Sequence, residues 1–257
     1  MFTKATLFAM TFSALAFGCG AAPDDGAGDN DEIVDNLVQA GYPRSEISVV
    51  DGVVYVGKDA EVSLQASREM IESGAGKEQY RTTNLVSLSL RTICIDGSKL
   101  TGVFGTALDA AISNYNERAL TFSMRRIASN RTGCDAVITG RISGPTGGSS
   151  GFPSGGQPFN KFQIGSGLKS FAVSTITHVI THELGHTIGF RHSDFFDRSI
   201  SCGGSPSNEG DGGIGAILIP GTPSGANVGG SIMNSCFRTV ETGEFTSSDV
   251  TALNALY

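Results

Sequence analysis

The stretch that decides how this chain folds and acts is HELGHTIGFRH, residues 182–192. His182 and His186 are four residues apart, so on a helix both imidazoles project from one face and can share a metal ion. Gly189 can adopt the left-handed conformation that ends a helix, and the chain can then bring His192 to the same ion. We expect these three histidines to bind one Zn²⁺ and to leave its fourth position open, as in catalytic zinc sites.

Glu183 follows His182 directly but is rotated by about 100° around the helix axis. Its carboxylate therefore points beside the metal, where it can hold a water molecule without being a ligand. We expect Glu183 to be the catalytic base. The fourth histidine, His178, lies one turn earlier on the same face. Because a fourth histidine ligand would close the metal site, we expect His178 at the rim of the site or in a hydrogen bond.

The predicted zinc-binding helix spans about residues 174–189, and its opposite face is apolar. Several β-branched residues lower its intrinsic helix propensity, so burial must stabilise it. The apolar face consists of residues spaced four apart, namely Ile176, Ile180, Leu184 and Ile188.

The amino-acid composition limits the classes of protein to which the chain can belong. The 257 residues include 25 acidic and 18 basic side chains, which gives a net charge of −7 and argues against nucleic-acid binding. The hydrophobic fraction of 39% is enough for a folded core. We therefore expect no nucleic-acid partner, and we expect a monomer.

The N-terminus has the features of an export signal. Residues 1–18 begin with one positive charge and continue as an apolar run too short to span a bilayer. The run ends in Ala-Phe-Gly before Cys19, which resembles the lipobox of bacterial lipoproteins. Lipidation of Cys19 would anchor the protein through an acidic tether, residues 19–32, whereas ordinary cleavage after Ala22 would release it. We expect export from a bacterial cell, with the protein either lipid-anchored at the envelope or secreted.

Four cysteines remain after Cys19 is set aside. In an exported protein an even number of cysteines suggests disulfides, but four cysteines allow three pairings and the sequence alone does not choose among them. Cys94 and Cys134 each lie at the end of a predicted strand, which favours a bridge between them. The other two are Cys202 and Cys236.

The chain divides at about residue 84. Residues 33–84 form a small α/β pro-like segment, with helices predicted over 32–40 and 60–71 and a hairpin over 47–56. Residues 85–257 form a larger α+β domain. Its predicted strands are 86–95, 120–127 and 135–142, its first helix is 101–118, and a last helix is capped by Thr246 with Asp249 in a capping box.

Three polar stretches leave alternatives open. Residues 151–165 can contain an edge strand that pairs with an extended substrate, or can be a surface loop. Asp194 and Asp197 can orient His192 or be solvated, with solvation favoured. Residues 208–212 could bind calcium, but their spacing does not fit an EF-hand loop and a surface turn is favoured.

The motif H-E-x-x-H-x-x-G-x-x-H is the metzincin signature. Residues 231–235, which contain Met233, resemble the Met-turn of that clan. The resemblance implies a metzincin-like α+β catalytic domain with a twisted mixed sheet, a long helix, a zinc-binding helix, a Met-turn and a C-terminal helix. Gly189 and Met233 would support the site. Cys202 follows the zinc motif and Cys236 the Met-turn, so the resemblance also implies that these two pair near the floor of the cleft.

Within the clan, HELGH at 182–186 and the runs at 192–194, 201–204, 219–223 and 231–234 resemble the dual-action HEIGH metallopeptidases. That resemblance implies an exported zinc endopeptidase that acts on protein or peptide substrates and hydrolyses their peptide bonds through a zinc-bound water. Residues 23–93 contain no Cys or His, so latency would need another group, such as an Asp, or steric cover. The alternative is an inactive metzincin-like surface lipoprotein for binding or adhesion, which would have no chemical need for Glu183.

Overall fold

The computed structural model describes residues 26–71, 80–210 and 216–257. One mixed sheet of eight strands runs through this part of the chain in the order β1-β2-β3-β8-β9-β7-β5-β6. Its strands are β1 (Ile47–Val50), β2 (Val53–Val56), β3 (Ala60–Glu61), β5 (Thr92–Asp96), β6 (Ser123–Ile127), β7 (Ala136–Ile142), β8 (Gly148–Gly151) and β9 (Lys161–Ile164). A separate pair joins β4 (Tyr80–Arg81) to β10 (Ile217–Leu218).

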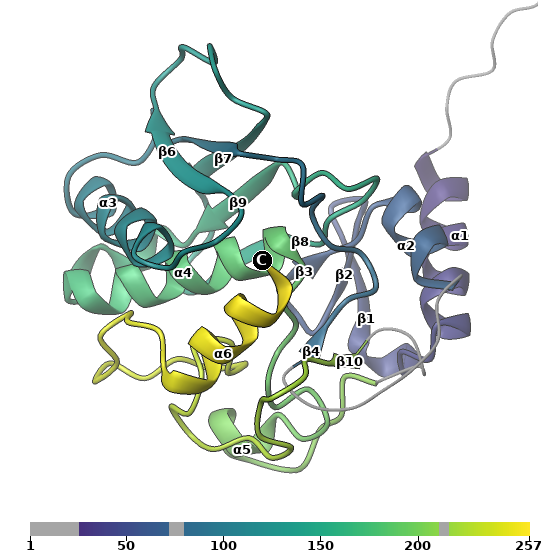
Figure 1. Ribbon diagram of the computed structural model, residues 1–257. Helices are drawn as coiled ribbons and strands as arrows, with labels where there is room; N and C mark the ends of the chain where they lie inside the picture. Colours follow the sequence, from purple (N-terminus) through teal and green to yellow (C-terminus); the bar gives the residue numbers. More distant parts are fainter. Residues whose placement is uncertain (1–25, 72–79, 211–215) are drawn as a thin grey trace, which may run out of the picture.

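Helices pack against the sheet and carry the zinc motif. In Figure 1 the helices α3 (Val103–Asn116) and α4 (Val173–Ile188) lie side by side across the sheet, and α6 (Ser247–Leu256) lies below them. Their apolar faces and the sheet bury one core, which includes Ile95, Leu108, Ile138 and Leu184. The remaining helical elements are α1 (Gly26–Gln39), α2 (Leu64–Ile71), α5 (Ser199–Cys202), η1 (Arg44–Glu46) and η2 (Ser166–Ser170).

The strand direction in the sheet changes at β8, which lies next to α4. Strands β6, β5, β7 and β9 are mutually parallel, whereas β8 is antiparallel to β9. The next strand, β3, pairs in parallel with β8. The expectation of an edge strand within residues 151–165 was misplaced, because β9 lies inside the sheet and β8 is the strand that the N-terminal segment covers.

The N-terminal segment, residues 33–84, has a core of its own but continues the same sheet. Helices α1 and α2 pack together over β1 and β2 at the right of Figure 1. The hairpin is confirmed: Asp51 and Gly52 both have positive φ, 51° and 77°, as a two-residue type I′ turn requires.

Two helix boundaries in this region differ from those predicted. The helix predicted over 60–71 is shorter, because residues 60–61 form β3 and the Ser63 hydroxyl caps α2 by accepting from the Ala66 amide. In addition, α1 begins at Gly26, inside the predicted tether of residues 19–32. The predicted signal, residues 1–18, and Cys19 lie outside the described residues.

Two disulfides tie the larger part of the chain together, and both predicted pairings are confirmed. Cys94 at β5 is bonded to Cys134, and Cys202 at the end of α5 is bonded to Cys236. Disulfides of this kind form in oxidising compartments, which indicates a protein that works outside the cytoplasm. Among the described residues, no helix is both long and apolar enough to cross a membrane.

Candidate metal centre

Helix α4 carries the first two histidines of the motif, and burial explains why it forms despite its β-branched residues. Every residue from Thr175 to Ile188 is buried. The hydroxyl of Thr181 donates to the Thr177 carbonyl one turn earlier, which satisfies a buried polar group within the helix. Gly189 then ends the helix in the left-handed region at φ 113°, as predicted. A Cβ there would lie 2.7 Å from the Asn84 carbonyl oxygen, so the position also needs a residue without a side chain.

The three predicted ligands come together. His182 and His186 project from α4, and His192 reaches them from the segment after Gly189. The Nε2 atoms of His182 and His192 are 3.3 Å apart, and the ligand atoms of all three histidines and of Asp59 lie within 4.8 Å of one another. Tetrahedral ligands at about 2.0–2.1 Å from zinc are about 3.3 Å apart, so this spacing fits zinc.

The other ring nitrogens show that the Nε2 atoms are available to a metal. His182 Nδ1 is 2.8 Å from the Ile232 carbonyl oxygen, and His186 Nδ1 is 2.8 Å from the Phe190 carbonyl oxygen. Because a carbonyl only accepts, each Nδ1 carries the proton and each Nε2 keeps its lone pair. Nε2 of His186 is buried without a hydrogen-bond partner. A bound cation would satisfy this atom.

Burial and mutual proximity favour the neutral form that a metal ligand requires in His182 and His186. In His192 burial acts the same way, but the Asp59 and Glu209 carboxylates outweigh it and raise the pKa to about 10. Burial lowers the pKa of His182 well below its usual value, and the other two histidines lower it further. Burial, together with the charge of His192, lowers the pKa of His186 to about 4. Both side chains are therefore neutral near pH 7.

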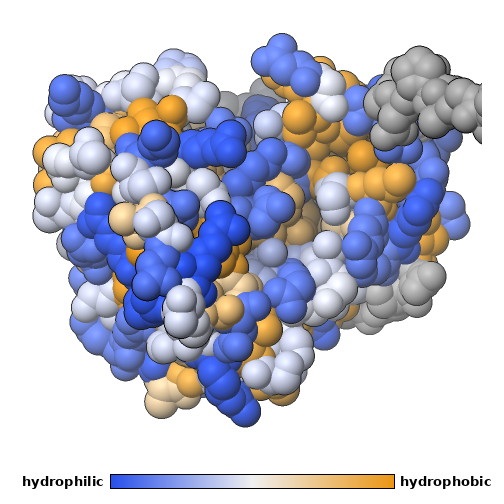
Figure 2. Space-filling view, turned by 90° about the horizontal axis from the view of Figure 1, so that it is seen from above, coloured by the Kyte–Doolittle hydropathy of each residue, from blue (hydrophilic) through white to orange (hydrophobic). Residues whose placement is uncertain are grey.

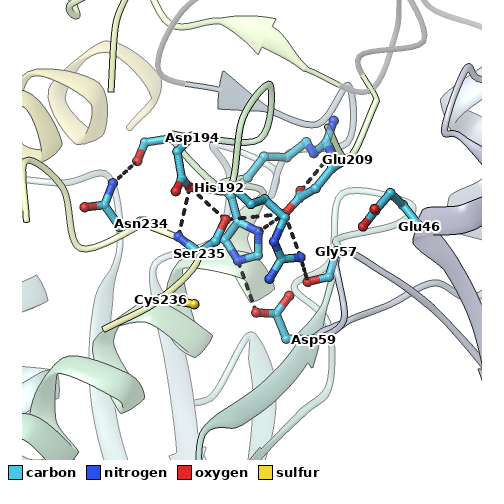
Figure 3. A network of polar contacts seen from close by, with 12 residues as sticks. Glu46, Gly57, Asp59, His192, Asp194, Glu209, Asn234, Ser235 and Cys236 are labelled. Atoms are coloured by element: carbon cyan, nitrogen blue, oxygen red, sulfur yellow. Dashed lines mark hydrogen bonds and ion pairs between the residues drawn. The ribbon is translucent and has the colours of Figure 1, made fainter. Parts of the chain in front are cut away.

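Asp59 is a fourth member of the cluster, and sequence reasoning did not find it. Its Oδ2 is 3.1 Å from His192 Nε2 and 3.9 Å from His182 Nε2, and its Oδ1 is 4.0 Å from His186 Nε2. Figure 3 shows its carboxylate facing His192. Asp59 directly precedes β3, so the pairing of β3 with β8 delivers the carboxylate to the open side of the three histidines.

Glu183 lies beside this cluster, as predicted. It is only 2% exposed, and its Oε2 is buried without a hydrogen-bond partner. Burial raises the pKa of Glu183 well above its usual value, and the nearby Asp59 carboxylate raises it further. A Cβ at Gly148 of β8 would overlap this carboxylate, so glycine is what allows the strand to pass so close.

A family model covers most of the chain, including the metal-binding cluster. The family model described as dual-action HEIGH metallo-peptidase matches residues 54–257. The chain belongs to this family. A search of curated proteins gave no match. One solved structure that is similar is that of myroilysin, with 13% identity, a TM-score of 0.39, and coverage of 68% of this chain and 95% of that one. Another is the hatching enzyme zinc-protease HCE-1 from Oryzias latipes, with 14% identity, a TM-score of 0.37, and coverage of 65% and 88%.

Membership makes the chain a metallopeptidase, and its histidine triad is the metal site typical of zinc metallopeptidases. The predicted Met-turn, residues 231–235, lies against the triad, since the Ile232 carbonyl oxygen is 2.8 Å from His182 Nδ1. Met233 is 4% exposed, and its sulfur comes so close to α4 that a Cβ at Gly185 would lie 2.6 Å from it. Gly185 of the HELGH motif thus permits the contact between the Met-turn and α4.

The Met-turn is fixed by the last helix of the metallopeptidase. The capping box of Thr246 and Asp249 forms as predicted. The Asp249 carboxylate also accepts from the Ser231 hydroxyl at 2.5 Å and from the Ile232 amide at 3.0 Å. Because the Ile232 carbonyl accepts from His182, the last helix positions a ligand through two hydrogen bonds.

His192 is oriented by a residue that sequence reasoning placed in a surface turn. Its Nδ1 is 2.5 Å from Oε1 of Glu209, which is 2% exposed. The surface turn favoured for residues 208–212 is therefore wrong at Glu209. Asp194 and Asp197 do not take this role in the structure. Asp194 is fully buried and accepts from the amide and hydroxyl of Ser235, whereas Asp197 accepts from Ser199.

A cavity of about 310 Å³ opens beside Asp59, His182 and Glu183. Its wall includes Phe237 and His178, and His178 Nε2 is paired with Glu241 at 3.2 Å. His178 is therefore near the site but outside the ligand cluster, as expected.

A second groove, of about 530 Å³, separates the hairpin β1–β2 from residues 143–149. The face in Figure 2 is hollowed between the catalytic part at the left and the N-terminal segment at the right.

Proposed function

We propose that this chain is a zinc endopeptidase in its latent form, with Asp59 of the N-terminal segment closing the metal site. One observation carries the proposal: the Asp59 carboxylate lies 3.1–4.0 Å from the Nε2 atoms of all three histidines. It occupies the open side of the triad, which is where the water and the substrate carbonyl must meet during peptide hydrolysis.

The donor set supports zinc as the metal. Three imidazoles, each oriented by a hydrogen bond at Nδ1, and a carboxylate oxygen are ligands that zinc binds readily. A zinc ion bound there would polarise a peptide carbonyl and lower the pKa of water to about 7. Glu183 would take the proton of the attacking water on its carboxylate and pass it to the leaving amine.

The sheet supports the assignment of residues 33–84 as a removable inhibitory segment. Strand β3 pairs with β8, whose antiparallel edge is the place where an extended substrate would add a strand. Asp59, immediately before β3, points at the histidines. One short stretch thus blocks both the peptide-binding edge and the metal. Removal of the N-terminal segment would expose both together.

We also propose that the protein is exported from a bacterial cell. The apolar run of residues 1–18 and the Cys19 context support a signal peptide, with lipid anchoring or free secretion as its two outcomes. The two disulfides agree with such a location. We expect the released enzyme to act as a monomer on protein substrates. N-terminal sequencing and mass measurement of the exported form will distinguish a lipidated Cys19 from cleavage after Ala22.

The test compares four forms of the full chain, each loaded with one equivalent of Zn²⁺, for cleavage of casein. We expect wild type to be nearly inactive and Asp59→Ala to be active, because the carboxylate no longer covers the triad. Asp59→Ala/Glu183→Gln should bind zinc but lose about 10²–10⁴-fold in rate. Glu61→Ala is the matched control on β3, where Glu61 only pairs with Lys161, and it should stay latent.

Two results would each refute one part. Equal activity of the Asp59→Ala and Glu61→Ala variants would refute the proposed inhibitory role of Asp59. Casein cleavage by the Asp59→Ala/Glu183→Gln variant at the rate of the Asp59→Ala variant would refute the proposed catalytic role of Glu183.

A further inference from the structure

We infer that Glu209 is the positioning residue of the third ligand: it holds the His192 ring so that Nε2 faces the other two histidines. This inference rests on the proposed zinc site. It assigns a role in that site to a residue outside the zinc motif, 17 positions along the chain from His192.

The need for such a residue follows from where each ligand sits. His182 and His186 are fixed by α4, and their Nδ1 atoms are held by backbone carbonyls. His192 lies beyond the end of the helix, in a segment without regular secondary structure. Its Nδ1 is held by a side-chain carboxylate, Glu209 Oε1, at 2.5 Å. A carboxylate at Nδ1 fixes both the tautomer and the orientation of a ligand imidazole and increases its basicity.

Glu209 is itself held rigidly. Its Oε2 is 3.2 Å from Nη2 of Arg191, and its Oε1 is 3.1 Å from Nη1 of Arg198. All three side chains are buried. The Glu209 amide donates to the Phe195 carbonyl at 2.8 Å, which anchors the backbone. Figure 3 shows Glu209 beside His192. Two fixed cations and one backbone anchor leave the carboxylate little freedom to move away from His192.

The Glu209 carboxylate has two roles that can be separated by substitution. The carboxylate compensates two buried guanidinium groups, which is a structural role that any carboxylate nearby could fill. It also reaches Nδ1 of His192, which requires a side chain of the length of Glu. The two roles predict opposite behaviour for two substitutions. Glu209→Asp keeps the charge and shortens the reach, whereas Glu209→Gln keeps the reach and an acceptor oxygen but loses the charge.

The experiment measures the Zn²⁺ dissociation constant of the full chain by competition with a chromophoric chelator. The visible spectrum of the Co²⁺-loaded protein is recorded alongside. We expect Glu209→Asp to bind Zn²⁺ about 10–100-fold more weakly and to show an altered Co²⁺ spectrum. Glu209→Gln should retain more of the affinity and the wild-type spectrum. Glu46→Gln is the control. In the described part of the chain Glu46 accepts a hydrogen bond from Ser207 and does not contact His192, so this substitution should change neither measurement.

Thermal melting of each metal-free variant separates folding from metal binding. The inference is overturned if Glu209→Asp binds Zn²⁺ like wild type while Glu209→Gln loses affinity, because the charge alone would then matter. It is also overturned if both variants bind like wild type with unchanged Co²⁺ spectra. A wild-type chain that binds no Zn²⁺ would instead refute the proposed zinc site, and with it this role of Glu209.

Discussion

Asp249 provides the most quantitative test of how the fold supports the metal site. We predict that Asp249→Ala destabilises the metal-free protein strongly, because the carboxylate serves both the last helix and the Met-turn. It accepts from the amides of Ile232 at 3.0 Å and Thr246 at 2.9 Å, and from the hydroxyls of Ser231 and Thr246. The residue is 3% exposed and its bonds to Ser231 and Ile232 are buried, so water cannot readily replace those two bonds.

The magnitude follows from the amides left without an acceptor. A buried donor without its partner costs about 1–3 kcal/mol. The buried Ile232 amide bears this cost in full, and the part-buried Thr246 amide bears a smaller one. Burial raises the pKa of Asp249, so the charged carboxylate carries a desolvation cost that its removal recovers. We therefore expect a net loss of about 3 kcal/mol. In a protein of this size that lowers Tm by about 6–12 °C.

The assay is thermal unfolding by circular dichroism in the presence of a chelator. The control is Asp109→Ala, since Asp109 is an exposed helix residue whose ion pair with Arg126 is worth at most about 1 kcal/mol. Equal Tm changes for the Asp249 and Asp109 variants would refute the reasoning. Asp249→Ala should also weaken Zn²⁺ binding, because the Ile232 carbonyl that holds His182 is no longer anchored.

Two further predictions concern the walls of the site. Gly148→Ala places a Cβ on the Glu183 carboxylate, so in the activated enzyme it should reduce casein cleavage by at least about 10-fold while zinc content stays unchanged; zinc loss in parallel with activity would contradict this. Replacing both Cys202 and Cys236 by Ser opens a loop whose ends are 34 residues apart. It should lower the free energy of unfolding by about 3–4 kcal/mol, measured by urea titration; a change below about 1 kcal/mol would show that the bridge constrains little.

The motif residues could be predicted because their spacing is local. A four-residue interval puts His182 and His186 on one helix face wherever the helix lies, and Gly189 and the Thr246 cap are also set by short-range backbone geometry. The Cys94–Cys134 pairing could be favoured because both cysteines are near the ends of predicted strands. The Met-turn and the Cys202–Cys236 bridge needed the family resemblance.

Asp59 and Glu209 could not be predicted because they act across long separations. Asp59 reaches the histidines only through the pairing of β3 with β8, and β3 is two residues long, too short for alternation to show. The predicted helix start at residue 60 also hid the strand, although Ser63 is a good N-cap. Glu209 stands in a stretch rich in Gly and Ser, which favours a surface turn. Its burial depends on two arginines and His192 from an earlier part of the chain.

The most direct test of the zinc site and of its closure by Asp59 is anomalous diffraction at the zinc absorption edge from crystals of the full chain grown with Zn²⁺. We predict one strong peak that contacts Nε2 of His182, His186 and His192 and a carboxylate oxygen of Asp59. A peak elsewhere, no peak, or a peak on the three histidines with Asp59 turned away would contradict the proposed latent zinc endopeptidase.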